Sequence, residues 1–459
     1  MRQRFHFIFC KIKKHTSAFV LLCISLSSIA QLPSFKATVY QPSSAGYYFF
    51  SAFYTPVNTF FILDKNGAIL YYKTLSPGSN AYNFQLQPNG QMSYSNLQQY
   101  FLMDSTFRII DSVSCQNMRY TDQHELCILP NGHFLLLGAD SVMTDLSKYF
   151  TDGETPDSVP VLVRWETIQE LDENRNVIFE WYSKDHFQLD DIDTFFMHKT
   201  PHFVSWTHSN ALEMDADGNI LLSTRNFNEI TKINRTTGEI MWRLGGKHNE
   251  FKFVNCPVPF YAQHDIRRIG NGHITLFDGG HNKIAHGARA LEFELDEQKK
   301  IATLKWSYVY DSTLSSKARG NVQRLNNSNT LINYGSLESA DVCFVVVDSL
   351  GHKVFELNSA DHMDPYRALN YATLPWQINR PQITCFDSLG VTYLDAGAGH
   401  LSYRWNTGDN TRIVPVKQPG EYFVFVPYGD GAFMSSEKIH VLNAKNLCKN
   451  LRLSNRKRK

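Results

Sequence analysis

The chain has 459 residues, with 45 lysines and arginines against 44 aspartates and glutamates, and a formal net charge of +1. Hydrophobic residues make up 43% and charged residues 19%, a balance that excludes a disordered or collagen-like chain. A net charge so close to zero argues against a dedicated nucleic-acid binder. The 32 Phe, 22 Tyr, 7 Trp and 26 Gly favour an all-β chain.

Residues 1–30 have the pattern of a secretory signal peptide. A basic stretch precedes an apolar run over 18–26, and Ser28-Ile29-Ala30 forms a small-x-small cleavage site before Gln31. An uncleaved anchor is the alternative, although the apolar run is shorter than the roughly 20 residues that span a bilayer. We therefore expect export to the periplasm or the cell surface, with no membrane span after cleavage.

Six cysteines follow the predicted leader, at scattered positions that match no zinc spacing. An oxidising compartment permits disulfides, but their connectivity does not follow from the sequence. Cys115 and Cys127 are the closest pair along the chain, so we expect this pairing first.

Two kinds of turn alternate between short strand-like runs after residue 31. The first kind is Asn-Gly or Asp-Gly before an apolar run, which is typical of hairpins with a type I′-like turn. It occurs at 88–90, 130–132, 217–218 and 271–272, and an Asn-rich loop at 326–329 takes the same place. The second kind puts Asp or Asn after an apolar strand, at 62–67, 102–105, 171–174, 233–238, 293–297 and 346–351.

The alternation of five hairpins of the first kind with six of the second predicts four-stranded antiparallel units. Repeats of about 40–55 residues built this way are typical of a β-propeller. We predict six blades over residues 31–375, with one blade closed by pairing of the N-terminal strand, near 36–50, with residues 366–371. A sandwich or barrel is the alternative, but it does not explain the alternation.

The repeat pattern stops near Pro375. Residues 380–443 contain a strand with Trp405 and a Gly-x-Tyr-x-Val-x-Val edge at 420–426, which together predict a small β-sandwich. This segment is similar to the immunoglobulin-like modules of secreted bacterial proteins, and it is a candidate for docking at the cell surface. Residues 444–459 end in four basic residues, and we expect a solvated, disordered tail there.

Three histidines take equivalent positions in consecutive predicted blades. His124 and His264 each lie seven residues before the Asn of the following turn, and His208 lies nine before its Asp. The innermost strand of a blade lines the channel, so the symmetry of the fold brings all three to one end. Because neighbours on a strand face opposite ways, Glu125 and Asp265 are not expected to orient the histidines beside them.

Arg225 ends the strand after the third hairpin, which places it beside His208. A buried arginine near His and Asn is costly unless an anion is bound, and a structural ion pair with a channel carboxylate is the alternative. Together with Asn210, which shares the face of His208, this set suits an oxyanion such as sulfate or phosphate. A three-histidine zinc site is the rival, but a divalent cation would repel Arg225.

Several motifs follow one another in order over about 45–372. They are His208-Ser209-Asn210-Ala211, the run 217–225 that ends in Arg225, the run 237–246, Gln263-His264-Asp265, and the runs 276–280, 320–324 and 364–368. Together they resemble the arylsulfotransferase family, which are exported aryl-sulfate sulfotransferases that need no nucleotide donor.

The resemblance implies a six-bladed propeller that moves a sulfuryl group from a phenolic sulfate ester to a phenol by a ping-pong route. It implies that His264 is the nucleophile and becomes transiently N-sulfated. It further implies that His208 and Arg225 bind the sulfuryl oxygens and that His124 is the acid/base towards the phenolic oxygen. No cofactor and no metal are implied, and the partners are a small aryl sulfate donor and a phenolic acceptor.

Other residues of the same stretches are candidates for substrate binding. Asn210 and Gln263 are candidate polar contacts, and Trp206, Phe260 and Tyr261 are candidates to flank an aryl group. For the three aromatic residues, ordinary core packing is the alternative.

One departure from the family pattern keeps other functions open. Cys256 stands alone where some bacterial members carry a close cysteine pair before the nucleophile. A non-catalytic propeller that binds sulfated or other anionic ligands is therefore the second hypothesis, and a metal-dependent hydrolase is the third.

Overall fold

The computed structural model describes residues 35–41, 46–53, 58–76, 78–146, 160–197, 203–280, 286–337, 341–360, 363–429, 431–442 and 448. The chain divides into two units, 1–32 and 33–459, and every element below belongs to the second. The predicted leader and, except for one residue, the predicted tail lie outside the described residues. No helix in the described part is long and apolar enough to cross a membrane.

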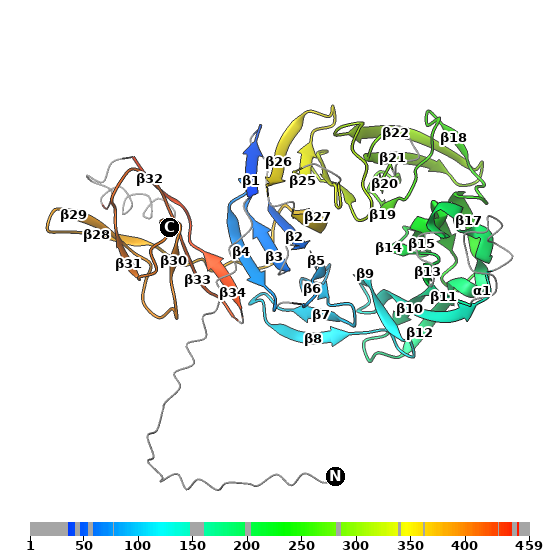
Figure 1. Ribbon diagram of the computed structural model, residues 1–459, viewed down its shortest axis with the longest axis horizontal. Coiled ribbons are helices and arrows are strands. Elements are labelled where there is room, and N and C mark those ends of the chain that lie inside the picture. Colours follow the sequence, from blue (N-terminus) through cyan, green and yellow to red (C-terminus); the bar gives the residue numbers. More distant parts are fainter. Residues whose placement is uncertain are drawn as a thin grey trace, which may run out of the picture. The chain divides into compact units, whose positions relative to one another are not determined.

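Six antiparallel sheets supply the blades (Figure 1). From the innermost strand outwards, blade one is β27 (Asp364–Tyr371), β2 (Tyr47–Phe53), β3 (Thr59–Leu63) and β4 (Ile69–Thr74). Blade two is β5 (Tyr82–Leu86), β6 (Met92–Ser95), β7 (Tyr100–Met103) and β8 (Ile109–Val113). Blade three is β9 (Tyr120–Ile128), β10 (Phe134–Thr144), β11 (Val161–Leu171) and β12 (Val177–Tyr182), with β13 (Phe203–Ser205) parallel to β11.

The remaining three blades follow the same order. Blade four is β14 (Ser209–Met214), β15 (Ile220–Thr224), β16 (Glu229–Ile233) and β17 (Ile240–Gly245). Blade five is β19 (His264–Arg268), β20 (Ile274–Asp278), β21 (Arg289–Asp296) and β22 (Ile301–Val309), with β18 (Lys252–Val254) parallel to β22. Blade six is β23 (Asn321–Arg324), β24 (Thr330–Asn333), β25 (Val342–Val347) and β26 (Lys353–Ser359), with β1 (Phe35–Val39) outermost.

The six innermost strands form a closed ring. In the order β27, β5, β9, β14, β19 and β23, each strand contacts the next, and the last contacts the first. Figure 1 shows the sheets standing around this centre. The predicted all-β fold with a six-bladed propeller is therefore confirmed.

The hairpins lie where the sequence predicts them, but their turns are of another type. The N–H of Gly90 donates to Gln87 O at 2.9 Å, and the N–H of Gln87 donates to Gln91 O at 2.7 Å. A type I′ turn needs a positive φ at both central residues, whereas here only the last loop residue, Gly90, has one, at +84°. Each inner hairpin is thus a type I turn followed by a left-handed residue, which at blade six is Ser328 (φ +68°).

The N-terminal stretch forms two strands, where one was predicted. Strand β2 pairs with β27, as expected for the closing blade. Strand β1 pairs instead with β26, so it extends blade six. The N-terminal segment therefore closes the ring on both sides of the seam between blades six and one.

The C-terminal module is all-β and has its own core. Its sheets are β28 (Thr384–Ser388), β29 (Val391–Asp395) and β31 (Ile413–Pro415); β32 (Gly420–Tyr422) and β35 (Ile439–Val441); and β30 (Arg404–Trp405), β33 (Val424–Pro427) and β34 (Ala432–Ser435). They enclose a cluster that includes Leu394, Trp405, Val414 and Val424. Because β34 pairs with β4, the sheet of blade one continues into the module. The immunoglobulin-like topology stays a prediction.

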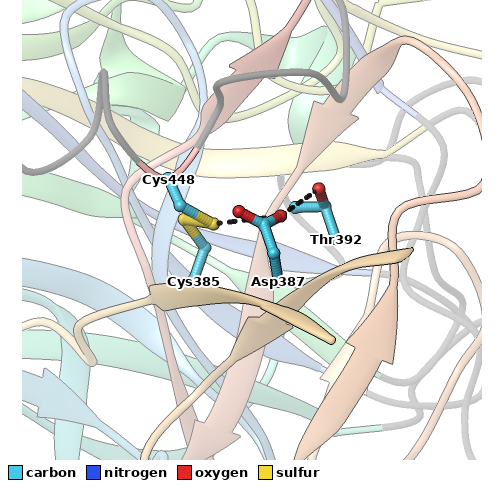
Figure 2. Close-up of a disulfide and its surroundings, with 4 residues drawn as sticks. All are labelled: Cys385, Asp387, Thr392 and Cys448. Carbon is cyan, nitrogen blue, oxygen red and sulfur yellow. Dashed lines mark hydrogen bonds between the residues drawn. A yellow bond between two sulfur atoms is a disulfide. The ribbon is translucent and has the colours of Figure 1, made fainter. Parts of the chain in front are cut away.

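The disulfide joins a different pair from the one expected. Cys385 on β28 is bonded to Cys448, and Figure 2 shows Asp387 beside this pair. Cys115 and Cys127 are both unbonded. Cys115 lies in the core between blades two and three, whereas the Cys127 thiol lies 3.6 Å from Leu212 O of blade four, so the two thiols lie on opposite sides of blade three.

The disulfide also corrects the prediction for the tail at one residue. Cys448 lies within the segment 444–459 that was expected to be solvated, yet it is buried and covalently held to β28. In the same surroundings the Thr392 hydroxyl donates to Asp387 at 2.6 Å (Figure 2).

Thiol mapping tests this pairing. Of the six cysteines after residue 30, we expect iodoacetamide to alkylate only four in the denatured, unreduced protein. A peptide linked through Cys385 and Cys448 should appear in the mass spectrum. The four reactive cysteines are Cys115, Cys127, Cys256 and Cys343. Alkylation of Cys385 without reductant would contradict the assignment.

A network of buried charges crosses the channel between the inner strands. Arg367 on β27 donates to both carboxylate oxygens of Glu125 on β9, at 2.9 and 3.0 Å. Arg267 on β19 donates to Glu125 at 2.6 Å and to Asp265 at 2.7 Å. The Nε of Arg367 lies 3.3 Å from Asp265, so two arginines share two carboxylates.

The same arginine reaches two further blades. Arg367 donates to Asn83 Oδ1 on β5 at 3.1 Å and to the carbonyl of Asn210 on β14 at 3.0 Å. Side-chain amides reinforce the ring, since Asn83 donates to His124 O and Asn210 donates to Gln263 O. We call Arg367, Arg267, Glu125 and Asp265 the channel network.

Removing one member of the channel network should destabilise the protein strongly. In Arg367→Met, Glu125 and Asp265 stay buried and lose a shared cation, so the free energy of unfolding should fall by about 3–5 kcal/mol in a denaturant titration. The matched control is Lys299→Met, which breaks an exposed pair with Asp296 and should leave the unfolding curve unchanged. Equal curves for both variants would contradict this prediction.

Candidate active site

The inner strands are interrupted at one level by β-bulges. On β19 the register shifts between the pairs His264–Phe277 and Arg267–Thr275, so one extra residue stands opposite β20. Strands β5, β9, β14 and β27 have shifts at the equivalent place. A bulge re-aims side chains, which strict alternation along a strand does not predict. It lets β19 present His264 to the site and Asp265, at a φ of +61°, to the channel network.

His264 is held by two backbone groups. Its Nδ1 lies 3.2 Å from Ala262 O, and its Nε2 accepts the N–H of Arg319 at 3.0 Å. Since a carbonyl only accepts and an amide N–H only donates, the ring proton belongs on Nδ1 and the lone pair on Nε2. Burial first, and then Arg225 and the other two histidines, hold the pKa of His264 well below its usual range. The imidazole is therefore neutral, as a nucleophile requires.

His208 and Arg225 are neighbours, as the sequence predicts. His208 lies between β13 and β14 with a φ of +46°, and its Nδ1 is 3.2 Å from the Ser205 hydroxyl. Arg225 begins the 3-10 turn η3 (Arg225–Phe227), and its backbone N–H donates to His208 O at 3.3 Å. Burial, and then the charge of Arg225, lower the pKa of His208 well below its usual range.

Arg225 is only 5% exposed and has no carboxylate partner among the described residues. Its guanidinium donates to Asn226 Oδ1 at 2.9 Å and to Lys317 O at 2.6 Å, and it lies over the ring of Phe196. Its Nε is buried without a hydrogen-bond partner in that part of the chain. Burial lowers the pKa of Arg225 to about 10. The predicted alternative, an ion pair with a channel carboxylate, is not what the structure shows.

His124 completes the group from β9. Its ring lies 5.3 Å from the ring of His208 and 6.0 Å from that of Tyr366 on β27. Its Nδ1 lies 2.5 Å from Asp122, a contact that sequence reasoning missed although the Asp-x-His spacing carries a signal for it. Within the described residues its Nε2 makes no hydrogen bond.

The two predicted polar contacts have structural partners. Asn210 donates to Gln263 O at 2.8 Å and so positions the residue before His264. Gln263 is fully buried, and its amide donates to Ser223 Oγ, Thr224 O and Glu229 O in blade four. Nε2 of Gln263 is thus committed to a neighbouring blade, whereas its Oε1 is buried without a hydrogen-bond partner among the described residues, so the substrate contact stays a prediction.

Of the three candidate aromatic residues, two pack in the core and one, Tyr261, lies at the site. Trp206 donates from Nε1 to Leu189 O at 3.1 Å, and Phe260 packs in the core between blades four and five, so both follow the core alternative. The ring of Tyr261 stacks on Phe196, with 5.8 Å between centroids. Phe196 comes from helix α2 (Thr194–Met197), in a long connection between β12 and β13 for which the sequence offered no signal.

A segment before β23, residues 316–320, lies across the site, and we call it the strap. Its carbonyl at Lys317 accepts from Arg225, and its N–H at Arg319 donates to His264. The Arg319 guanidinium is paired with Asp364, which also accepts the N–H of Ser336. The strap therefore contacts Arg225 and His264 through its backbone atoms. Backbone contacts do not depend on the side chains of the strap, so the sequence does not predict them.

The geometry bears on the choice between a metal and an anion. Among the described residues, His, Cys, Asp and Glu side chains form no group of three that could hold a metal ion. His208 and His264 instead lie near Arg225, which has no carboxylate partner among the described residues, and this favours an anionic ligand.

Comparison with known proteins identifies the family. The profile of the arylsulfotransferase (ASST) family matches residues 34–343, which is more than half of the chain. The chain belongs to the arylsulfotransferase family. Membership identifies it as a sulfotransferase enzyme, and the matched range of the arylsulfotransferase contains all four residues predicted to be catalytic.

Solved structures similar to the arylsulfotransferase share little sequence with it. A protein of unknown function from Bacteroides caccae has 12% identity and a TM-score of 0.46, over 71% of this chain and 99% of that one. A streptogramin B lyase has 12% identity and a TM-score of 0.37, over 78% and 94%. A gluconolactonase from Xanthomonas campestris has 10% identity and a TM-score of 0.38, over 73% and 93%. No curated protein matches the sequence.

The lowered histidine pKa values predict a pH dependence of stability. Because folding depresses the pKa of His264, the unfolded chain binds a proton near pH 6.5 while the folded chain does not, so stability is lost as the pH falls below that value. We expect His264→Gln to reduce the slope of unfolding free energy against pH between pH 7 and 5.5, by at most one proton, or about 1.4 kcal/mol per pH unit. The stabilities of both proteins are referred to their values at pH 8. Equal slopes for wild type and variant would contradict the lowered pKa of His264.

Proposed function

We propose that the arylsulfotransferase transfers a sulfuryl group from a small phenolic sulfate ester to a phenolic acceptor, with His264 as the covalent carrier. The observation that supports this most is a neutral, buried imidazole beside a buried arginine without a carboxylate partner. The negatively charged oxygens of a sulfuryl group would compensate the positive charge of Arg225. The sulfur of that group is the electrophile that the lone pair of His264 would attack.

In the first half of the reaction, Nε2 of His264 attacks sulfur and the bond from sulfur to the phenolic oxygen breaks. The electron pair goes to the phenolic oxygen, which takes a proton from Nε2 of His124. Arg225 and His208 bind the peripheral oxygens, and donors of this kind contribute about 3–4 kcal/mol each to the transition state. The contact from Nδ1 to Ala262 O supports the positive charge of the sulfated ring.

The second half reverses these steps with another phenol. The acceptor gives its proton to His124 and attacks sulfur, which releases His264 and makes the route ping-pong. Before the first half can proceed, the hydrogen bond from the N–H of Arg319 to Nε2 must break, because it occupies the attacking lone pair. A small displacement of the strap would free both Nε2 and the guanidinium of Arg225.

We also propose that the protein works outside the cytoplasm. The predicted leader over 1–30 and the disulfide between Cys385 and Cys448 support export, since disulfides persist in oxidising compartments. The C-terminal module would then be a docking unit in the periplasm or at the cell surface.

A chromogenic assay tests the proposed chemistry. With 4-nitrophenyl sulfate we expect a burst of nitrophenol, faster turnover when a phenol is added, and a sulfuryl adduct on the peptide that contains His264. His264→Ala should abolish all three, and Arg225→Met should lower the burst rate by about 10²–10³-fold. The control is His352→Ala, an exposed histidine in an outer turn of blade six, which should keep full activity.

Each alternative function predicts a different result in this assay. A protein that only binds anions releases no nitrophenol and forms no adduct. A hydrolase is indifferent to added phenol, and a metal-dependent one loses activity on chelation. Phenol release that survives in His264→Ala would exclude His264 as the carrier.

A further inference from the structure

Asp122 lies between His124 of the candidate site and Arg164 of the blade-three sheet. It is 1% exposed, and one oxygen, Oδ1, lies 2.8 Å from the backbone N of His124 and 2.5 Å from its Nδ1. The other oxygen, Oδ2, accepts from Arg164 at 2.5 Å. Asp122 and His124 are two positions apart on β9, a spacing that places side chains on one face of a strand, and both lie in the register shift between the paired residues Thr121 and Leu126.

Arg164 comes from β11 and reaches across β10 to this carboxylate. It also lies 3.6 Å from Glu166, and its strand neighbour across the parallel pair is Ser205, whose hydroxyl contacts His208. The position of Asp122 is thus tied to the connection that carries His208. Burial opposes the charge of Asp122, but His124 and Arg164 outweigh it and lower the pKa of Asp122 to about 2.

A carboxylate at Nδ1 determines what His124 can do. Because the ionised carboxylate only accepts, Nδ1 keeps its proton and Nε2 is the atom that gains or loses one. The negative charge of Asp122 also stabilises the imidazolium when Nε2 is protonated, although His208 and Arg164 lie close by. This is the arrangement by which a buried Asp orients the histidine of a hydrolase triad.

We propose that Asp122, held by Arg164, is a positioning residue that keeps His124 as the proton donor to the departing phenolic oxygen. The proposal rests on the proposed function and adds a substrate class, which is sulfate esters of weakly acidic phenols without electron-withdrawing substituents. As the bond from sulfur to oxygen breaks, the electron pair goes to oxygen and the Nε2 proton follows. The need for this proton grows as the phenol becomes less acidic.

Two donors with different leaving groups test the proposal. 4-Nitrophenyl sulfate releases an acidic phenol, which leaves without a proton. 4-Methylphenyl sulfate releases a weakly acidic phenol, which needs one. In Asp122→Asn, whose amide can reverse the tautomer of His124, we expect the rate of adduct formation on His264 to fall about 10²-fold or more with the methyl donor. With the nitro donor we expect a loss of less than about tenfold, because protonation contributes little there.

Further variants separate positioning from folding. His124→Ala should show the same dependence on the leaving group, and adding Asp122→Asn to it should cause no further loss. Arg164→Gln leaves the carboxylate of Asp122 in place and should show a smaller excess loss of rate with the methyl donor. This variant also tests the proposal if Asp122→Asn does not fold. Asp348→Asn makes the same change of charge in an outer turn and should alter neither rate.

The outcomes distinguish this inference from the proposed function. If wild type forms no adduct on His264 with either donor, the proposed function fails and this inference fails with it. If wild type forms the adduct but Asp122→Asn slows both donors equally, or slows neither, only the inference is overturned. A larger loss with the methyl donor, in a variant with the thermal midpoint of wild type, supports it.

Discussion

The channel network is the interaction on which the rest of this structure depends. Two arginines and two carboxylates from blades one, three and five neutralise one another, and all but Arg267 are almost fully buried. Such an arrangement is stable only when every member is present, because any one left alone is a buried, unpaired charge. The residues of the candidate site stand directly beside it, His124 next to Glu125 and His264 next to Asp265. The network therefore sets the distances between the histidines as well as holding the ring together.

Charge compensation differs between the channel network and the candidate site beside it. In the channel network each cation has a carboxylate, whereas Arg225 has none among the described residues. Burial, and then Arg225 itself, lower the pKa values of His208 and His264. An anion that enters the site supplies the missing charge, and the cost of keeping Arg225 buried and unpaired becomes binding energy for it. The strap satisfies part of this demand, since its carbonyl at Lys317 accepts a hydrogen bond from Arg225.

Patterns that repeat along the chain were predictable from the sequence, and single contacts were not. The alternation of turns predicted six blades because each hairpin is specified by a few adjacent residues. The shared spacing of His124, His208 and His264 predicted a common site because repeats place equivalent residues at equivalent heights. The strap and Phe196 escaped prediction because they reach the site from connections outside the repeat. The bonds from the Gln263 amide to blade four escaped it because they join residues far apart in the chain.

The sequence by itself determined the all-β architecture, the blade number, the family and the identity of the nucleophile candidate, since these are written in local turn chemistry and ordered motifs. Only the tertiary structure decided which cysteines are bonded, how Arg225 comes to have no carboxylate partner among the described residues and how Asp122 holds His124. These features depend on contacts between segments far apart in the chain, and the bulges of the inner strands shift the strand register by one residue or more. A period-two pattern cannot reveal such a shift, because the residues on either side of it still alternate correctly.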